Sequence, residues 1–378
     1  MANPPPSPRH RQRAVRSQTD RLSILSDELL ITIISLLPTR LAARTSLLCR
    51  RFQHLWKTCP SVYLSEDRTI DTTTFEAMAT CAIIRRQSSN PLVSLRLNYA
   101  FHLPYTFLCS LLVKAHFLGL QHLIIDGAGD DIESIMPAIF SIGTLLFLQL
   151  PAVTPGTLPS VVTLTILKTL SLCLYDADSA EFNRLLAQLP SLEELRLMLV
   201  FTEWFTLSSQ TIRKLDLCLL DTPPQLEFVG LSMPLLEMFH FNGTLHANVP
   251  RIEGDMPSLI KAVIILDGLS KKDSTTVAQL LNCVSNVEEL SLNITESSGG
   301  DPRLCELRVD RGFLHARLAS GGPRKDQAAV ELLLFVSRAW TRRNRERRCT
   351  CEPRQDLPSH DPSCFREPRK DRTEEEVV

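Results

Sequence analysis

The stretch "SAEFNRLLAQLPSLEELRL", residues 179–197, contains two apolar periodicities in succession. Its first part has the spacing of an amphipathic helix, with apolar residues three or four positions apart at Phe182, Leu185, Leu186 and Leu189. The hexamer "LEELRL", residues 192–197, then alternates apolar and polar residues, which is typical of a half-buried β-strand. A helix followed directly by a short strand predicts a chain that returns to begin a new strand beside the previous one.

Segments like this hexamer recur along the chain and indicate a repeat protein. The nine segments are LVSLRL (92–97), LQHLII (120–125), LLFLQL (145–150), LKTLSL (167–172), LEELRL (192–197), IRKLDL (212–217), LEMFHF (236–241), LIKAVI (259–264) and VEELSL (287–292). Their spacing lies in or beside the range of about 20–29 residues that is typical of leucine-rich repeats. A second returning segment, residues 273–286, also has helical apolar spacing. Because each repeat buries only one face, neighbours must stack to close a core.

The predicted fold is therefore α/β: a curved parallel sheet with helices on its outside. A compact α/β domain with leucines at chance spacings is the alternative. Residues between the inward-pointing leucines of each strand face away from the core and line the concave surface. This surface mixes charged and apolar residues, which suits a protein or peptide partner better than a polyanion. As substrate-binding candidates on it we name Arg96, His122, Gln149, Arg196, Asp216 and His240.

The segment "LSDELLITIISLLPTR", residues 25–40, is unusually apolar for a short helix near a polar N-terminus. Ser26 can cap the helix, and Asp27 and Glu28 favour its first turn, while Pro38 ends it. Its leucines and isoleucines cover roughly 220° of the helix surface, whereas packing on one core needs about 100°. One apolar face can pack on the helical segment that follows, residues 41–56. The other must meet either the rest of the chain, as a helical cap on the next domain, or another protein.

Residues 20–60 resemble the F-box of plant F-box/leucine-rich-repeat proteins. The matching features occur in order: Asp20-Arg21, Leu25 ahead of Asp27-Glu28-Leu29-Leu30, Leu37-Pro38-Thr39, Arg44-Thr45-Ser46, and Arg50-Arg51-Phe52 ahead of Leu55-Trp56. The resemblance implies binding to a Skp-type adaptor, and through it to a cullin. It puts adaptor-facing or module-core positions at Leu25, Leu29, Leu30, Ile33, Ile34 and Pro38. The family usually has proline where this chain has Ser26, so we expect weakened but not abolished adaptor binding.

Composition limits the partners and the cellular compartment that the sequence allows. The 378 residues can hold two domains, and the net charge of −1 does not favour nucleic acid or a membrane surface as a partner. Most of the 11 cysteines lie in apolar segments with irregular spacing, which indicates reduced thiols in a cytoplasmic or nuclear protein. No apolar stretch is long enough for a transmembrane helix, and the N-terminus lacks the apolar core of a signal peptide.

We divide the chain into five parts. These are a disordered Pro/Arg-rich leader (1–19), the F-box (20–60), a linker with a capping helix (61–90), the leucine-rich repeats (91–296) and a divergent, largely disordered Arg-rich tail (297–378). The leader has two other interpretations, a nuclear-localisation patch or an organelle transit peptide. The tail departs from the family pattern, and a basic interaction patch or an unusual splice or reading product remains an alternative for it. Within the tail, residues 326–340 read as a helix.

The motifs of metal, nucleotide and nucleophile chemistry are missing from the sequence. One cysteine and histidine group in the tail departs from the standard zinc spacings, and its members are Cys349, Cys351, His360 and Cys364. We therefore expect no catalytic residue, no metal site and no cofactor. The leading hypothesis is a non-catalytic substrate-recognition subunit of a Skp-cullin-F-box ubiquitin ligase. The alternatives are an interaction scaffold with no ligase role, and a repeat domain that binds a small-molecule co-ligand.

Overall fold

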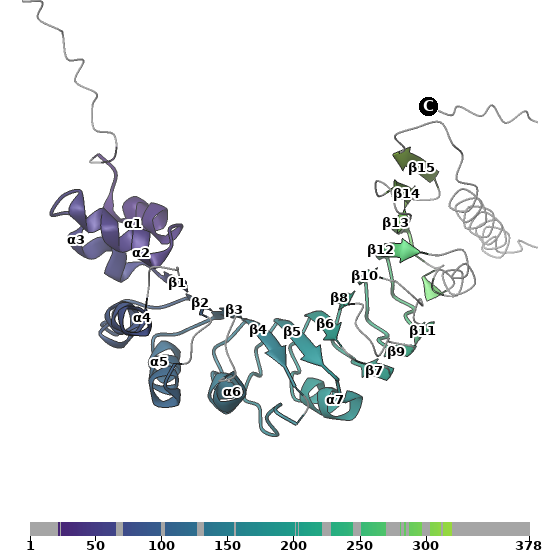
Figure 1. Cartoon of the computed structure of the whole chain (residues 1–378), viewed down its shortest axis with the longest axis horizontal. Helices are drawn as coiled ribbons and strands as arrows, with labels where there is room; N and C mark the ends of the chain where they lie inside the picture. Colours follow the sequence, from purple (N-terminus) through teal and green to yellow (C-terminus); the bar gives the residue numbers. More distant parts are fainter. Residues whose placement is uncertain are drawn as a thin grey trace, which may run out of the picture.

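The structure is a computed structural model of the chain. It describes residues 22, 24–65, 71–99, 103–126, 132–154, 156–200, 202, 204–220, 228–244, 251–269, 280, 283–284, 287–296, 303–310 and 313–319. Among these, residues 244, 251, 255, 267–269 and those from 294 onward are described by their backbone alone. The chain forms a curved solenoid that begins in a small helical module, and its strands line the concave side (Figure 1).

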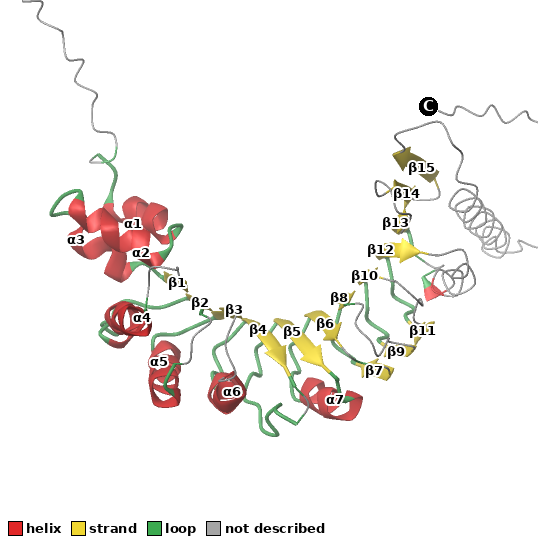
Figure 2. Ribbon diagram, viewed as in Figure 1, coloured by secondary structure: helices red, strands yellow, loops and turns green. Residues whose placement is uncertain are grey.

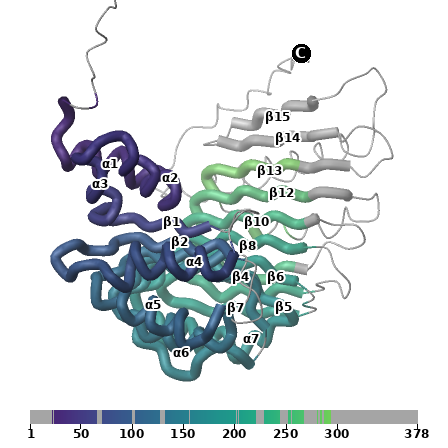
Figure 3. The backbone as a smooth tube through the Cα atoms, turned by 60° about the vertical axis from the view of Figure 1, so that its left-hand side comes forward, coloured from purple at the N-terminus to yellow at the C-terminus, as the bar shows by residue number. Residues whose placement is uncertain are grey.

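One large sheet runs through the whole solenoid. Within the described residues it holds twelve strands, and β1 to β13 pair in parallel in chain order, with β7, β9 and β11 left out. The strands are β1 (Ser61–Ser65), β2 (Ser94–Asn98), β3 (His122–Asp126), β4 (Phe147–Val153), β5 (Thr169–Tyr175), β6 (Glu194–Val200), β8 (Lys214–Leu219), β10 (Met238–Thr244), β12 (Lys261–Leu269), β13 (Glu289–Glu296), β14 (Arg303–Asp310) and β15 (Phe313–Ala319). Figure 3 shows these strands stacked as a ladder. Nine of them begin at the third residue of the nine predicted hexamers and contain the last four residues of each, so the predicted parallel sheet is confirmed.

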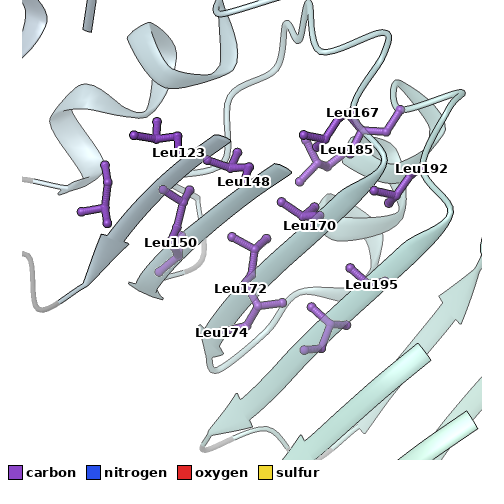
Figure 4. Packing of buried hydrophobic residues seen from close by; sticks show 14 of the residues in the cluster. Leu123, Leu148, Leu150, Leu167, Leu170, Leu172, Leu174, Leu185, Leu192 and Leu195 are labelled. Carbon is purple, nitrogen blue, oxygen red and sulfur yellow. The ribbon is translucent and has the colours of Figure 1, made fainter. Parts of the chain in front are cut away.

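The core is built from in-register rows of leucine. Leu95 pairs with Leu123, which pairs with Leu148, and the row continues through the next strands to Leu215. Every side chain of this row is at most 1% exposed. Parallel pairing places the equivalent leucines of this row side by side (Figure 4), and the register between β4 and β5 shifts only after Gln149, beyond the row. Each repeat thus closes the core of its neighbour.

The outer layer changes type along the solenoid. Helices cover the first half: α4 (Thr72–Ala79), continued by the π-helical turn η3 (Thr80–Ile84), α5 (Tyr105–Phe117), α6 (Ile132–Phe140) and α7 (Ser179–Ala187). Beyond α7 the outer layer is a three-stranded parallel sheet, hereafter the outer sheet, of β7 (Trp204–Ser208), β9 (Phe228–Ser232) and β11 (Arg251–Asp255) (Figure 2). The prediction of helices outside the sheet is thus correct for the first half and wrong for residues 204–255. The predicted helix at 273–286 lies mostly outside the described residues.

A helix and a strand meet where the outer layer changes. Asn183 of α7 donates to the Thr206 carbonyl at 2.9 Å and accepts from the Ser208 N–H at 2.9 Å. Ser179 of the same helix accepts from the Thr206 N–H at 3.0 Å. These side chains form hydrogen bonds with backbone groups of β7 that would be unpaired if this strand edge were free. The residues of β7 alternate between exposed and buried, which is the period of a strand and not of a helix.

The N-terminal module, residues 22–60, packs its short helices around a core of its own. They are α1 (Asp27–Ser35), α2 (Thr39–Arg44), η1 (Thr45–Leu47), α3 (Phe52–Leu55) and η2 (Trp56–Thr58). Leu30, Ile34, Phe52 and Leu55 form the centre of this core. Trp56 packs against both this core and the solenoid core, so the two parts share one side chain at their boundary.

The junction between module and solenoid is continuous and tightly bonded. The strand β1 follows the module directly and pairs with β2, and its Tyr63 N–H donates to the Thr39 hydroxyl at 2.9 Å. Arg86 is only 5% exposed, and its guanidinium donates to the carbonyls of Cys59, Asn90 and Pro91. Desolvation lowers the pKa of Arg86 from its usual value. Residues 61–90 were expected to hold a linker and a capping helix. The helix is present as α4 with η3, and the start of the segment is the strand β1 and not a linker.

The solenoid also extends further than the repeats that the sequence reveals. Strands β14 and β15 pair antiparallel and add to the edge of β13. They lie in the segment that we expected to be a largely disordered tail, whereas the remainder of the tail and the leader lie outside the described residues. Strand β14 contains LCELRV (304–309), which keeps the apolar spacing of the hexamer and was not recognised, whereas β15 lacks that spacing.

A glycine in β11 is predicted to be required for the outer sheet. A Cβ atom on Gly254 would lie 2.6 Å from the Leu231 carbonyl oxygen and 2.9 Å from the Leu231 Cβ. We expect Gly254→Ala to lower the free energy of unfolding by about 1–3 kcal/mol, because backbone atoms of β9 would have to move. Gly143→Ala is the matched control, since its nearest atom would be 3.3 Å away. Equal thermal midpoints for the two variants would contradict the prediction.

Candidate docking surfaces

The first candidate surface is on α1, and its start is fixed by local bonds. The Ser26 hydroxyl accepts from the Leu29 N–H at 3.5 Å, and the backbone of Ser26 is extended. Hydrogen bonds from the Glu28 backbone and from Ser26 lower the pKa of the Glu28 carboxyl. Arg51, ahead of α3, contacts Asp27 at 2.7 Å and donates to the Leu25 carbonyl at 2.5 Å. These contacts fix the orientation of α1 relative to α3.

The two faces of α1 differ sharply in exposure. Leu30 and Ile34 are 1% and 2% exposed and belong to the module core, whereas Leu29 and Ile33 are 53% and 44% exposed. Sequence reasoning placed all four among the adaptor-binding candidates. Burial excludes direct partner contact for Leu30 and Ile34, because the core of the module already surrounds them. Leu25 and Pro38 are half-buried at the two ends of the helix.

Further apolar side chains are exposed around α1. They are Leu22, Ile24, Leu36, Leu41, Leu47 and Leu48, and the exposed fractions of Leu36 and Leu47 are 81% and 85%. We call these six residues together with Leu29 and Ile33 the apolar module surface. None of the six was among the adaptor-binding candidates, because apolar spacing in the short helices of this module does not tell a core position from an exposed one. This many exposed apolar side chains on one small module is typical of an interaction site.

The second candidate surface is the concave face of the large sheet. Five of the six predicted residues lie in one row across the strands, in the register Arg96, Ile124, Gln149, Ser171, Arg196, Asp216 and His240. His122 lies one row away, where its ring stacks on Phe147 with centroids 6.0 Å apart. The structure therefore brings the predicted residues to one face, although they span strands β2 to β10.

Charged groups on this face are paired with one another. Arg96 contacts Asp126 at 2.8 Å and lies over the Tyr63 ring, and Gln149 donates to Asp126 at 3.0 Å. Asp126 thus joins two of the predicted residues, although the prediction did not include it.

Charged groups are also paired toward the C-terminal end of this row. Arg196 contacts Glu194 at 2.7 Å, and His240 Nδ1 contacts Asp216 at 3.1 Å. Because these charges are already partly compensated, a binding partner needs matching polar groups more than a large net charge.

Two thiols on the concave face show no sign of nucleophile activation. Burial raises the pKa of Cys173, and the pKa of Cys218 is raised by burial and by the nearby Asp216 carboxylate. A thiol with a raised pKa stays protonated at neutral pH, and the protonated form is a poor nucleophile.

Among the described residues there is neither a candidate metal site nor a helix that could span a membrane. No group of three or more His, Cys, Asp or Glu side chains among them is arranged to hold a metal ion. The cysteine and histidine group of the tail lies outside them. No helix in the part of the chain that the structure describes is long and apolar enough to cross a membrane.

Comparison with known proteins identifies the N-terminal module and finds relatives that extend into the repeats. Residues 22–63 match the F-box domain, so the N-terminal module is an F-box. An F-box/FBD/LRR-repeat protein of Arabidopsis thaliana is 26% identical over 287 residues, which are 73% of this chain and 60% of the relative. An FBD-associated F-box protein of the same plant is 23% identical over 286 residues, 74% of this chain and 66% of the relative.

A further Arabidopsis relative with an F-box/FBD/LRR-repeat description is 32% identical over 179 residues, 47% of this chain and 42% of its own length. The match thus spans less than two thirds of each of these three relatives. No solved structure matches the chain significantly. The F-box match and the parallel sheet of the solenoid are consistent with the F-box and LRR-repeat descriptions of these relatives.

Proposed function

We propose that this chain, a member of the plant F-box/leucine-rich-repeat family, is a substrate-recognition subunit of a Skp-cullin-F-box ubiquitin ligase. The observation that carries the proposal is the exposed half of α1. Leu29 and Ile33 are turned to solvent on a helix whose other face fills the module core. Burying these exposed apolar side chains against a partner lowers the free energy of the complex. A Skp-type adaptor is the partner of F-boxes.

The proposed role is non-catalytic. The adaptor and the cullin would carry the transfer machinery, and the repeats would hold the target protein near it. Rate enhancement would come from proximity, because a bound target has a high effective concentration at the ligase. Direct passage from the F-box into β1, together with the Arg86 contacts, supports a fixed distance between the adaptor and the concave face.

For the target we propose a polypeptide bound along the concave row from Arg96 to His240. The row offers hydrogen-bonding groups at most of its positions, with the apolar Ile124 between Arg96 and Gln149. Cytoplasm or nucleus is the proposed place of action, because the described cysteines are free thiols.

The test is a titration of the purified full-length chain with a Skp-type adaptor by calorimetry, followed by co-purification with a cullin. We expect saturable binding with one adaptor per chain. A chain that binds no adaptor and still captures a partner through its concave face would support the alternative, a scaffold with no ligase role.

Residue 26 offers a graded test of the same surface. Ser26 has φ −67°, which is the angle that a proline ring imposes. Its cap hydrogen bond is long, at 3.5 Å, so little is lost when it is removed. We therefore expect Ser26→Pro to tighten adaptor binding by about 2- to 10-fold through added apolar contact, measured by calorimetry.

Ser26→Ala is the matched control, because it removes the cap without adding the ring. We expect its affinity to equal that of the natural chain or to fall slightly. Equal affinities for the proline and alanine variants would contradict a contact at this position.

A further inference from the structure

A shallow groove lies on the outward face of the outer sheet. Its volume is 330 Å³, and its lining comes from β7, β9, β11 and Asn183 of α7. Because these strands form the convex layer, the groove is separate from the concave row and from the F-box (Figure 1). Neither part of the proposed ligase function uses it.

Parallel pairing arranges the outward residues of the groove in rows. The first row holds Trp204, Phe228 and Arg251, the second Thr206, Gly230 and Glu253, and the third Ser208, Ser232 and Asp255. Phe228 lines the groove itself, and Trp204 lies beside it, next to the Phe228 ring. One end of the groove is therefore aromatic, and the other end carries hydroxyl groups.

At the aromatic end, the rings of Trp204 and Phe228 form a wall, and the open surface at Gly230 forms the floor beside it. Trp204 is 60% exposed, and its ring lies 5.6 Å from that of Phe228 with an interplanar angle of 35°. A Cβ atom on Gly230 would lie 3.1 Å from the Phe228 ring and 3.2 Å from the Thr206 methyl group. The floor is thus open only because residue 230 is glycine.

The polar end suits a neutral ligand that carries many hydroxyl groups. The hydroxyls of Thr206, Ser208 and Ser232 are exposed and make no hydrogen bond to other described residues. Each hydroxyl can donate one hydrogen bond and accept others. Glu253 is the charged side chain among the described lining residues, and its carboxylate disfavours phosphorylated or otherwise anionic ligands.

The groove is held in shape by the bonds of α7 to β7. Asn183 and Ser179 occupy backbone groups of Thr206 and Ser208, so a peptide cannot add as a strand at that edge. Cys283 donates to the Ile252 carbonyl at 3.0 Å on β11. The lining of the groove therefore offers a ligand the face of the outer sheet and not the β7 edge.

We propose that this groove binds a neutral saccharide. A pyranose ring has an apolar C–H face and a rim of hydroxyl groups. The C–H face of one ring would pack on Phe228 and Trp204, with its hydroxyls near Thr206. The rows of Phe228 and Ser232 are about 13 Å apart along the strands, so Ser208 and Ser232 would bond to the hydroxyls of the next ring. A shallow site of this volume holds a short oligosaccharide along one face. The proposal stands independently of adaptor binding.

The test uses the full-length chain with cellotriose, chitotriose and mannotriose as probes. Saturation-transfer NMR should show saturable binding of at least one of them, with transfer strongest to the C–H face. Trp204→Ala should weaken that binding at least about tenfold, since it removes the exposed half of the aromatic wall. Phe117→Ala is the matched control, because it removes an aromatic side chain that is 77% exposed on α5, and it should leave binding unchanged.

Gly230→Val provides a second variant that fills the floor, and its thermal midpoint shows whether the outer sheet remains folded. Loss of binding in a folded Gly230→Val chain would support the site. The proposal would be overturned if none of the three saccharides binds, or if binding survives Trp204→Ala. It would also be overturned if a proline-rich peptide, and no saccharide, gave signals that Trp204→Ala abolishes.

Discussion

Leu29→Asp combined with Ile33→Asp should lower the affinity for a Skp-type adaptor by at least about 100-fold, because each carboxylate would enter an apolar interface without a partner. Both side chains are exposed in the free chain, at 53% and 44%, so the substitutions remove no core contact. Aspartate in a helix interior costs only about 0.5 kcal/mol per residue relative to better helix formers. The double variant should therefore remain folded, with circular dichroism and a thermal midpoint near those of the natural chain.

The matched control places the same charges elsewhere on the surface. Val113→Asp combined with Phe117→Asp changes two apolar residues of α5 that are 51% and 77% exposed. We expect adaptor affinity to be unchanged in this control. Adaptor binding that persists in the α1 variant would show that the adaptor docks elsewhere, or that the exposed face of α1 serves another partner.

Arg86→Met should lower the free energy of unfolding by about 3–5 kcal/mol, because it leaves buried carbonyl groups without their charged donor. The guanidinium of Arg86 donates to Cys59 at the end of the F-box and to Asn90 and Pro91 ahead of β2. The Asn90 and Pro91 contacts are both 2.9 Å long. Methionine fills a similar volume but donates no hydrogen bond, so the effect reports the hydrogen bonds and not a cavity.

Arg85→Met is the matched control for the junction. Arg85 precedes Arg86 in the chain and is exposed, so its loss should change stability by no more than about 0.5 kcal/mol. Urea denaturation followed by tryptophan fluorescence measures both variants, since Trp56 lies at the boundary of the two cores. Equal midpoints would mean that the packing of Trp56 and the pairing of β1 hold the junction without Arg86.

The core strands were predictable from sequence because their signal is local. A strand that buries one face needs an apolar residue at every second position, and nine hexamers show this pattern. The interval between hexamers then fixes the repeat, so the parallel sheet follows without any long-range information. Strand β1 lacks the hexamer: only Val62 and Leu64 mark its inward side, which is too short a pattern to recognise.

The outer layer was predicted correctly only in part. The segment of α7 has helical apolar spacing, and a helix forms there. The segment of β7 alternates instead, with Phe205 and Leu207 buried, and a strand forms. That strand depends on Asn183 and Ser179 of α7 at its edge and on β9 at its other side, which are tertiary contacts.

For the candidate sites, the sequence by itself determined which residues face the concave surface and which helix carries the surplus of apolar residues. Only the tertiary structure decided that Leu29 and Ile33 are exposed while Leu30 and Ile34 are buried. All four are apolar and lie on one short helix, so composition and spacing cannot separate them. Leu30 and Ile34 are buried because α2, α3 and η2, which follow α1 in the chain, pack against that face of the helix.

The same reason explains the pairs on the concave face and the groove on the convex face. Asp126 meets Arg96 from 30 residues away, and Trp204 meets Phe228 across a segment of the chain that carries β8. Periodicity records which side of a strand a residue occupies, because that depends on its immediate neighbours. Which residues then meet depends on the register between strands, and this register is set by the packing of the whole solenoid.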